Sequence, residues 1–249
     1  MDLLFSRRKF NRIKHMVSVL PENQIFAILS FVLVLIGYVG YYFSAKNDKA
    51  DYLNRSTRDV INMRLQGFYW MGILPFLAML VFGYFSTYTL SHFGLGLKFP
   101  IENLYWILGF AAVLIPLNYF NAPRKDNLHI YPQIREKEWN LSLQGKEYFT
   151  WFIYLLAYEW LFRGVFYFGS REVMEFIPAL VLNTVVYAVV HLPKGLKETV
   201  ASVPLGILLC ILVERTGVFY GAAIIHFTQA ASSSFFSLRA HPDMKIVKS

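Results

Sequence analysis

Long apolar runs recur along the whole sequence and constrain the fold more than any other feature. They cover residues 25–45, 67–90, 104–120, 149–168, 176–192, 199–213 and 218–236. A helix needs about 20 mainly apolar residues to cross a bilayer, and it satisfies its backbone hydrogen bonds within itself. The pattern predicts an all-α fold, a polytopic transmembrane helical bundle of about seven spans with an eighth left open, plus an interfacial helix.

The composition agrees with a membrane protein. Of the 249 residues, 56% are hydrophobic, 18% are aromatic and only 16% are charged, whereas about 25% are charged in a typical soluble domain. The net charge of +8 comes from Lys and Arg residues between the apolar runs and at the chain ends. This distribution is typical of loops beside lipid headgroups, so we predict membrane lipids, and no nucleic acid, as partners. The lone Cys210 excludes a disulfide within one chain.

Polar stretches divide the chain into segments of different composition. Residues 1–24 are basic, and we predict that they rest on the membrane surface. Residues 25–146 hold three spans with polar connectors, residues 147–238 hold the remaining spans as a core, and residues 239–249 form a polar tail. Aromatic and charged residues alternate over 130–139, which predicts an interfacial helix there.

One apolar run, residues 149–168, contains two charged residues. Glu159 and Arg163 each cost roughly 2.5–3.5 kcal/mol at the centre of a spanning helix. Their i, i+4 spacing places both side chains on one face, where they can pair. Charges inside spans usually face a polar interior, so the pair predicts an intramembrane functional site. The alternative is a buried pair that only fixes helix packing.

Polar residues in the later runs can reach the same site. Asn183, Tyr187 and His191 follow one helix face at i, i+4 and i+8. Histidine is more often a hydrogen-bonded structural residue than a catalyst. His191 is a catalytic candidate only because Glu159 occurs with it.

The last two runs add further candidates. His226, Gln229 and Ser233 share a face in the final run, and Glu198 opens the run before it. A carboxylate in the first turn of a helix is also favourable without any function. We predict that the following residues, from four helices, surround one pocket: Glu159, Arg163, His191, Glu198 and His226.

One glutamate and two histidines suit the hydrolysis of a peptide bond within the membrane. A buried carboxylate beside a histidine can activate a water molecule, and a second donor can stabilise the oxyanion. This chemistry requires no cofactor. The same three side chains are also a plausible shell for a divalent metal such as zinc, although the HExxH spacing is absent. A proton-coupled transporter is a third possibility, because such residues also form proton relays.

Three short motifs in this order resemble the CAAX protease and bacteriocin-processing family, which includes the Ras-converting prenyl-protein endopeptidase. They are Tyr-Glu-Trp-Leu-Phe-Arg-Gly at 158–164, Tyr-Ala-Val-Val-His at 187–191 and His-Phe-Thr-Gln-Ala at 226–230. The resemblance implies an intramembrane endopeptidase in which Glu159 and His191 activate water. It also implies that His226 binds the oxyanion and that Arg163 braces Glu159. Residues 147–238 would then be the catalytic core.

The chain departs from the family pattern at two positions. Tyr158 stands where the family has the first of two glutamates, and Ala230 stands where it has Asn or Asp. Gln229 could supply the missing amide. A bacterial branch also has a single glutamate, followed by His-x-x-Lys and a later Glu, as His191, Lys194 and Glu198 are arranged here.

The resemblance therefore implies a multi-pass protein in the cell membrane of a bacterium, with a membrane-associated peptide or protein as substrate. The two departures favour an alternative, a catalytically impaired relative that acts as a membrane binding or immunity protein. Retention of Glu159, His191 and His226 favours the enzyme.

Overall fold

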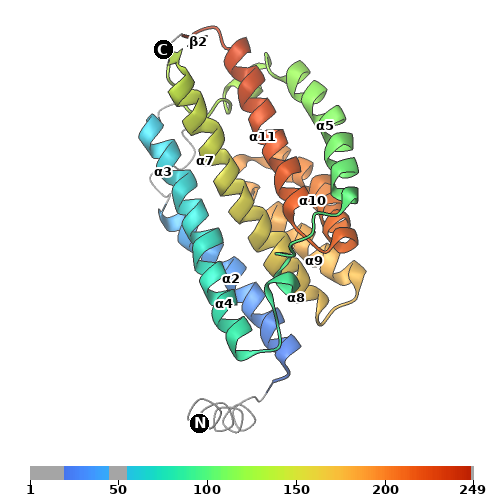
Figure 1. The fold of residues 1–249 in the computed structure, drawn as a ribbon. Coiled ribbons are helices and arrows are strands. Elements are labelled where there is room, and N and C mark those ends of the chain that lie inside the picture. Colours follow the sequence, from blue (N-terminus) through green and yellow to red (C-terminus); the bar gives the residue numbers. More distant parts are fainter. Residues whose placement is uncertain (1–19, 45–54, 248–249) are drawn as a thin grey trace.

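The computed structural model describes residues 20–44 and 55–247 and shows a helical bundle (Figure 1), which confirms the predicted all-α class. Most of the predicted basic N-terminal segment lies outside the described residues. The longer helices are α2 (Glu22–Ser44), α3 (Thr57–Phe68), α4 (Leu74–Phe85), α5 (Ile101–Asn121), α7 (Leu141–Glu159), α9 (Phe176–Val189), α10 (Leu196–Thr216) and α11 (Tyr220–Ala240). Shorter elements are the π-helices η2 (Tyr69–Ile73) and η4 (Trp160–Tyr167), the 3-10 helices η3 (Leu90–Phe93) and η5 (Leu192–Lys194), α6 (Lys125–Leu128), α8 (Phe168–Arg171), β1 (Glu138–Trp139) and β2 (Lys245–Ile246).

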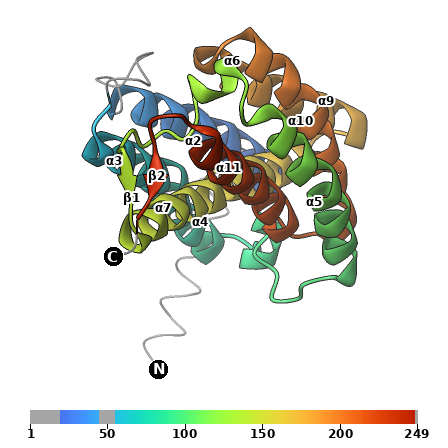
Figure 2. The ribbon, with the colours of Figure 1, turned by 90° about the horizontal axis from the view of Figure 1, so that it is seen from above.

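Helix α7 is the central element of the bundle. It packs against α3 on one side and against α11 on the other, and α5 covers the far side of α11 (Figures 1 and 2). Helices α9 and α10 form a packed pair, and α2 contacts α8 and η4. The central position of α7 explains why its two glutamates, Glu147 and Glu159, are buried although they lie in an apolar bundle.

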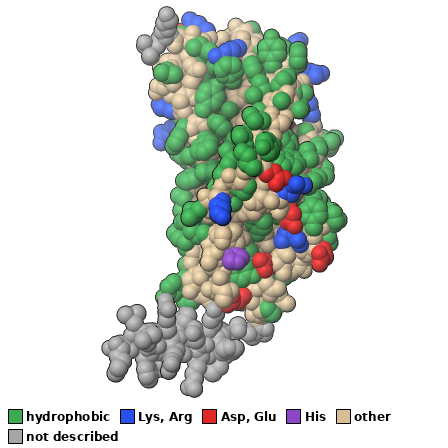
Figure 3. Space-filling model, turned by 45° about the vertical axis from the view of Figure 1, so that its right-hand side comes forward, with side chains coloured by type: hydrophobic (Ala, Val, Ile, Leu, Met, Phe, Trp, Pro, Cys, Tyr) green, Lys and Arg blue, Asp and Glu red, His purple; other side chains and the backbone are tan. Residues whose placement is uncertain are grey.

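The outer surface is apolar over the length of the helices. Four helical stretches, among the described residues, are long and apolar enough to cross a membrane: Glu22–Ser44, Thr57–Phe85, Ile101–Asn121 and Leu196–Thr216. Only 11–33% of each apolar window is buried, so most of its side chains face outward. Hydrophobic side chains accordingly cover much of the face in Figure 3. The protein is a multi-pass integral membrane protein.

The second span begins earlier than the sequence suggested. The predicted polar connector is already helical from Thr57, and one continuous helical stretch runs to Phe85. A capping box starts it, because the Ser56 side chain accepts from the Asp59 N–H and the Asp59 side chain accepts from the Ser56 N–H. The π-helix η2 ends two residues before Pro75, which has no backbone N–H to donate to the preceding turn.

The predicted interfacial helix over residues 130–139 is wrong. This segment is irregular and ends in β1, which pairs in parallel with β2 near the C-terminus. Pro132 has no backbone N–H and restricts Tyr131 before it, so the segment cannot propagate a helix. Its apolar residues are also not at an interface, since Ile134 and Trp139 are buried in the protein.

Candidate active site

Glu159 and Arg163 form a buried ion pair in the middle of the long helix that α7 begins. Arg163 Nη1 lies 2.9 Å from Glu159 Oε2, and both side chains are 0% exposed. The α-helix widens into the π-helix η4 at the residue after Glu159. Such widened turns occur often at functional sites because they redirect side chains.

His226 on α11 contacts the other oxygen of the same carboxylate. Its Nδ1 lies 2.6 Å from Glu159 Oε1. A carboxylate accepts hydrogen bonds, so Nδ1 carries the proton and donates it, which leaves the lone pair of the neutral ring on Nε2. The His226 side chain is 12% exposed whereas that of Glu159 is 0% exposed. Glu159 therefore joins two helices, with a cation on one oxygen and an imidazole on the other.

His191 lies after the end of α9, one residue before η5, and its side chain is buried. Its Nδ1 lies 2.8 Å from the backbone oxygen of Tyr187. A carbonyl oxygen only accepts, so His191 also carries its proton on Nδ1 and its lone pair on Nε2. The two histidines thus share one tautomer, fixed by different partners.

Two tyrosines lie between these groups. The ring plane of Tyr158 is nearly perpendicular to both imidazoles, with centroids 5.7 Å from His226 and 6.4 Å from His191. The guanidinium of Arg163 lies 4.1 Å from the centroid of the Tyr187 ring, which is a cation–π contact. Tyr187 also lies 4.6 Å from the His191 ring. These contacts bring Glu159, Arg163, His191 and His226 around one cluster of rings.

Asn183 supports this cluster through the backbone. Its Nδ2 donates to the Phe162 carbonyl at 2.8 Å, and its Oδ1 accepts from Cys210 Sγ at 3.2 Å. Asn183 is 0% exposed. It therefore ties α9 and α10 to the π-helix that follows Glu159.

No hydrogen bond or ion pair among the described residues joins the remaining candidates to this cluster. The amide of Gln229 is paired with Asn118 of α5 in both directions, at 3.1 and 3.3 Å. Glu198 lies half-buried in the first turn of α10, and no hydrogen bond or ion pair joins it to another described residue. The side chain of Lys194 is outside the described part. Within the described ranges, no three His, Cys, Asp or Glu side chains gather closely enough to hold a metal.

A second buried ion pair was not predicted from the sequence. Arg64 Nη1 of α3 lies 2.7 Å from Glu147 Oε2 of α7, and both side chains are 0% exposed. Glu147 Oε1 accepts from Trp151 Nε1 at 3.0 Å and from Ser234 Oγ of α11 at 2.6 Å. Gln133 Oε1 accepts from Arg64 Nη2 at 3.1 Å. This network joins α3, α7 and α11, whereas the Glu159 cluster joins α7 to α11 and to the α9 end.

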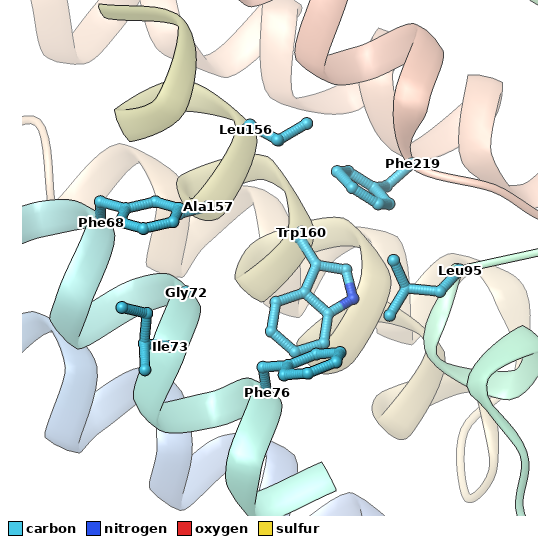
Figure 4. A pocket seen from close by; sticks show the side chains of 9 residues that line it. All are labelled: Phe68, Gly72, Ile73, Phe76, Leu95, Leu156, Ala157, Trp160 and Phe219. Carbon is cyan, nitrogen blue, oxygen red and sulfur yellow. The ribbon is translucent and has the colours of Figure 1, made fainter. Parts of the chain in front are cut away.

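An apolar pocket of about 230 Å³ lies beside the residue that follows Glu159 (Figure 4). Trp160 stands at its centre, between a wall from η2 and α4 and the side chains of Leu95 and Phe219. The indole N–H donates to the Phe93 carbonyl at 2.9 Å, which holds Trp160 in place. The nine lining residues are Phe68, Gly72, Ile73, Phe76, Leu95, Leu156, Ala157, Trp160 and Phe219.

The long apolar helices and the buried contact between Glu159 and His226 define an integral membrane protein with a polar site inside its helical bundle. Residues 148–232 match the family model of the type II CAAX prenyl endopeptidase Rce1-like proteins. This segment carries the Rce1-like domain, and the predicted family resemblance is confirmed. All four principal candidates, Glu159, Arg163, His191 and His226, lie within it. At the family level, the match supports a CAAX-type intramembrane protease. No curated protein and no solved structure gives a match to the chain.

Proposed function

We propose that the protein is an intramembrane endopeptidase that hydrolyses a peptide bond of a membrane-associated protein or peptide. The observation that carries this proposal is the 2.6 Å contact between Glu159 Oε1 and His226 Nδ1 inside the bundle. A carboxylate that fixes the tautomer of an imidazole leaves the other ring nitrogen as a base. The Rce1-like match over the same residues supports proteolysis as the reaction.

In the proposed reaction, His226 Nε2 takes a proton from a water molecule. The oxygen of this water then attacks the peptide carbonyl carbon. Glu159 stabilises the imidazolium that forms, and Arg163 holds the carboxylate from its other oxygen at 2.9 Å. His191 directs the lone pair of its Nε2 at the same water and orients it. When the tetrahedral intermediate breaks its C–N bond, His226 gives its proton to the leaving amine.

This assignment differs from the roles that the family resemblance implies for the two histidines. The resemblance pairs Glu159 with His191 as the base and gives His226 to the oxyanion. The hydrogen bonds instead favour His226 as the base, because Glu159 contacts His226 while the Nδ1 of His191 is held by the Tyr187 backbone. The proton on Nδ1 of His226 is already donated to Glu159, so neutral His226 has no second N–H for an oxyanion.

The apolar pocket supports a substrate with a hydrophobic anchor. Its lining is almost entirely apolar side chains, and Trp160 connects it along the chain to Glu159. Binding in such a pocket is favourable because it removes apolar surface of the substrate from water. We therefore propose that an apolar or lipid-modified part of the substrate occupies it while the scissile bond lies at Glu159 and His226.

The test uses purified protein in proteoliposomes and a panel of internally quenched peptides, both farnesylated at a C-terminal cysteine and unmodified. Glu159→Gln and His226→Ala should each lower kcat by about 10³-fold, within the range of general acid–base catalysis, and His191→Ala should also lower it. His129→Ala is the matched control, because His129 is exposed and outside the matched segment. Equal turnover by the His226 and His129 variants would overturn the proposal. An intact cellular phenotype in all three site variants would favour the binding or immunity role instead.

A further inference from the structure

The proposed reaction needs a hydrogen-bond donor for the oxyanion, and the predicted donors are occupied. The Nδ1 protons of His226 and His191 are donated to Glu159 and to the Tyr187 carbonyl. The Gln229 amide is paired with Asn118, and position 230 is an alanine. A tetrahedral intermediate without a donor to its oxygen is poorly stabilised, because such donors are usually among the largest contributions to catalysis. Another group near the histidines must supply the bond.

The hydroxyl of Tyr158 meets this requirement. Tyr158 is 4% exposed, and its Oη has no hydrogen-bond partner among the described residues. A buried hydroxyl without a partner is unfavourable in an apolar interior. The ring is fixed by stacking on Phe162 with centroids 4.5 Å apart, and it stands at 82° to the His226 ring and 89° to the His191 ring. The ring that carries this hydroxyl is therefore held beside the imidazoles of His226 and His191.

Tyr187 is the other buried tyrosine of the cluster, but it has a different environment. Its ring lies under the Arg163 guanidinium, 4.1 Å from the centroid, and its backbone oxygen holds His191. These contacts make Tyr187 a support for two other side chains. The Tyr187 hydroxyl, like that of Tyr158, has no hydrogen-bond partner among the described residues. The Tyr158 ring lies closer to the proposed base, with its centroid 5.7 Å from that of His226 compared with 6.3 Å for Tyr187.

We infer that Tyr158 is a further catalytic residue, whose hydroxyl donates a hydrogen bond to the carbonyl oxygen of the scissile peptide; the inference rests on the proposed function. As the water oxygen forms its bond to the carbonyl carbon, the π electrons of the C=O bond move to the carbonyl oxygen. Tyr158 donates to this oxyanion and keeps its own proton. When the C=O bond forms again, the C–N bond breaks and the nitrogen receives the proton held by His226.

Tyr158→Phe tests the inference, because it removes one oxygen atom and keeps the ring. The expected result is a fall in kcat of about 10²-fold with KM within about threefold of wild type, since an oxyanion donor acts mainly in the transition state. The midpoint of thermal unfolding should stay equal or rise, because the lost hydroxyl had no hydrogen-bond partner among the residues that the structure describes. A hydroxyl with a purely structural role would instead lower that midpoint and leave kcat of the folded fraction unchanged.

Tyr154→Phe is the matched control. Tyr154 lies one turn earlier on α7, with its ring 6.1 Å from that of Tyr158, and it has no part in the proposed chemistry. Its variant should retain the wild-type kcat. A Tyr158→Phe enzyme with kcat within threefold of wild type, measured beside an inactive Glu159→Gln variant, would overturn the inference while leaving the proposed function intact. A wild-type kcat in Glu159→Gln would overturn the proposed function itself.

A second pair of substitutions covers the case in which Tyr158→Phe does not fold. Replacing Tyr158 with 4-aminophenylalanine keeps an N–H donor at the same place, and replacing it with 4-methylphenylalanine keeps the size without a donor. The amino variant should turn over at least tenfold faster than the methyl variant. Equal rates would refute donation by this position.

Discussion

The buried pair of Arg64 and Glu147 gives a prediction whose size follows from the structure. Glu147→Gln should lower the free energy of unfolding by about 3–5 kcal/mol, the range for breaking a fully buried ion pair. Both side chains are 0% exposed and 2.7 Å apart. Glutamine keeps the size and one carbonyl oxygen for Trp151 and Ser234, which donate to Glu147 at 3.0 and 2.6 Å. The substitution therefore removes mainly the charge that balances Arg64.

An exposed ion pair of the same chain provides the control. Lys245 Nζ lies 3.0 Å from Glu138 Oε1, and the two side chains are 68% and 62% exposed. Exposed pairs contribute only about 0–1 kcal/mol because water and salt screen them. Glu138→Gln should therefore change stability by less than about 1 kcal/mol. The two variants differ in burial and not in the chemistry of the substitution.

The assay is the loss of folded protein in detergent as a function of temperature, measured by size-exclusion chromatography. A shift of about 2–4 °C per kcal/mol is expected for a chain of this length, so Glu147→Gln should unfold roughly 6–20 °C below wild type. Replacing both members by apolar residues, with Arg64→Met and Glu147→Leu, should recover much of the loss, because no unpaired charge then remains buried. Glu147→Gln and Glu138→Gln with the same midpoint would refute this reasoning.

Two further predictions concern a close backbone approach and a surface contact. A Cβ on Gly164 would lie 2.6 Å from the Phe93 carbonyl oxygen, so Gly164→Ala should lower stability by about 1–3 kcal/mol and reduce turnover. Gly145, on α7, is the control, because a Cβ added there would meet nothing within 4 Å. Gly145→Ala should be neutral or stabilising by up to about 1 kcal/mol in the same melting assay. A hydrogen bond from Lys197 lowers the pKa of Asp126 in the folded protein. The stability from this contact is therefore complete above the ordinary aspartate pKa of about 4. It is lost as the pH falls through the lower pKa of the folded state. Amide exchange in the first turn of α10, corrected for the intrinsic pH effect, should rise only in acid, and Asp126→Asn should show no such step.

The sequence predicted the features that depend on local pattern. Apolar length predicted the membrane bundle, and the i, i+4 spacing predicted the pair of Glu159 and Arg163, 2.9 Å apart in the structure. The order of the three motifs predicted the family match over residues 148–232. Each of these follows from residues that are close in the chain or from a linear motif.

The features that the sequence did not predict depend on contacts between distant segments. Arg64 and Glu147 lie 83 positions apart and both fall outside the predicted apolar runs, so no periodicity links them. Asn118 reaches Gln229 only because α5 packs on α11. Their partners are set by helix packing, which a single sequence does not specify. For residues 130–139, the alternation of aromatic and charged residues predicted a helix, although Pro132 within the segment disfavours one.

The most direct test of the central claim is hydrolysis in ¹⁸O-labelled water, with purified protein in proteoliposomes and product analysis by mass spectrometry. We predict that the wild-type protein cleaves a quenched peptide and places one labelled oxygen in the new carboxyl group. Glu159→Gln, which leaves His226 without its carboxylate partner at 2.6 Å, should give no product above background. Labelled product at the wild-type rate from Glu159→Gln would contradict the claim that this buried carboxylate and imidazole carry out the reaction.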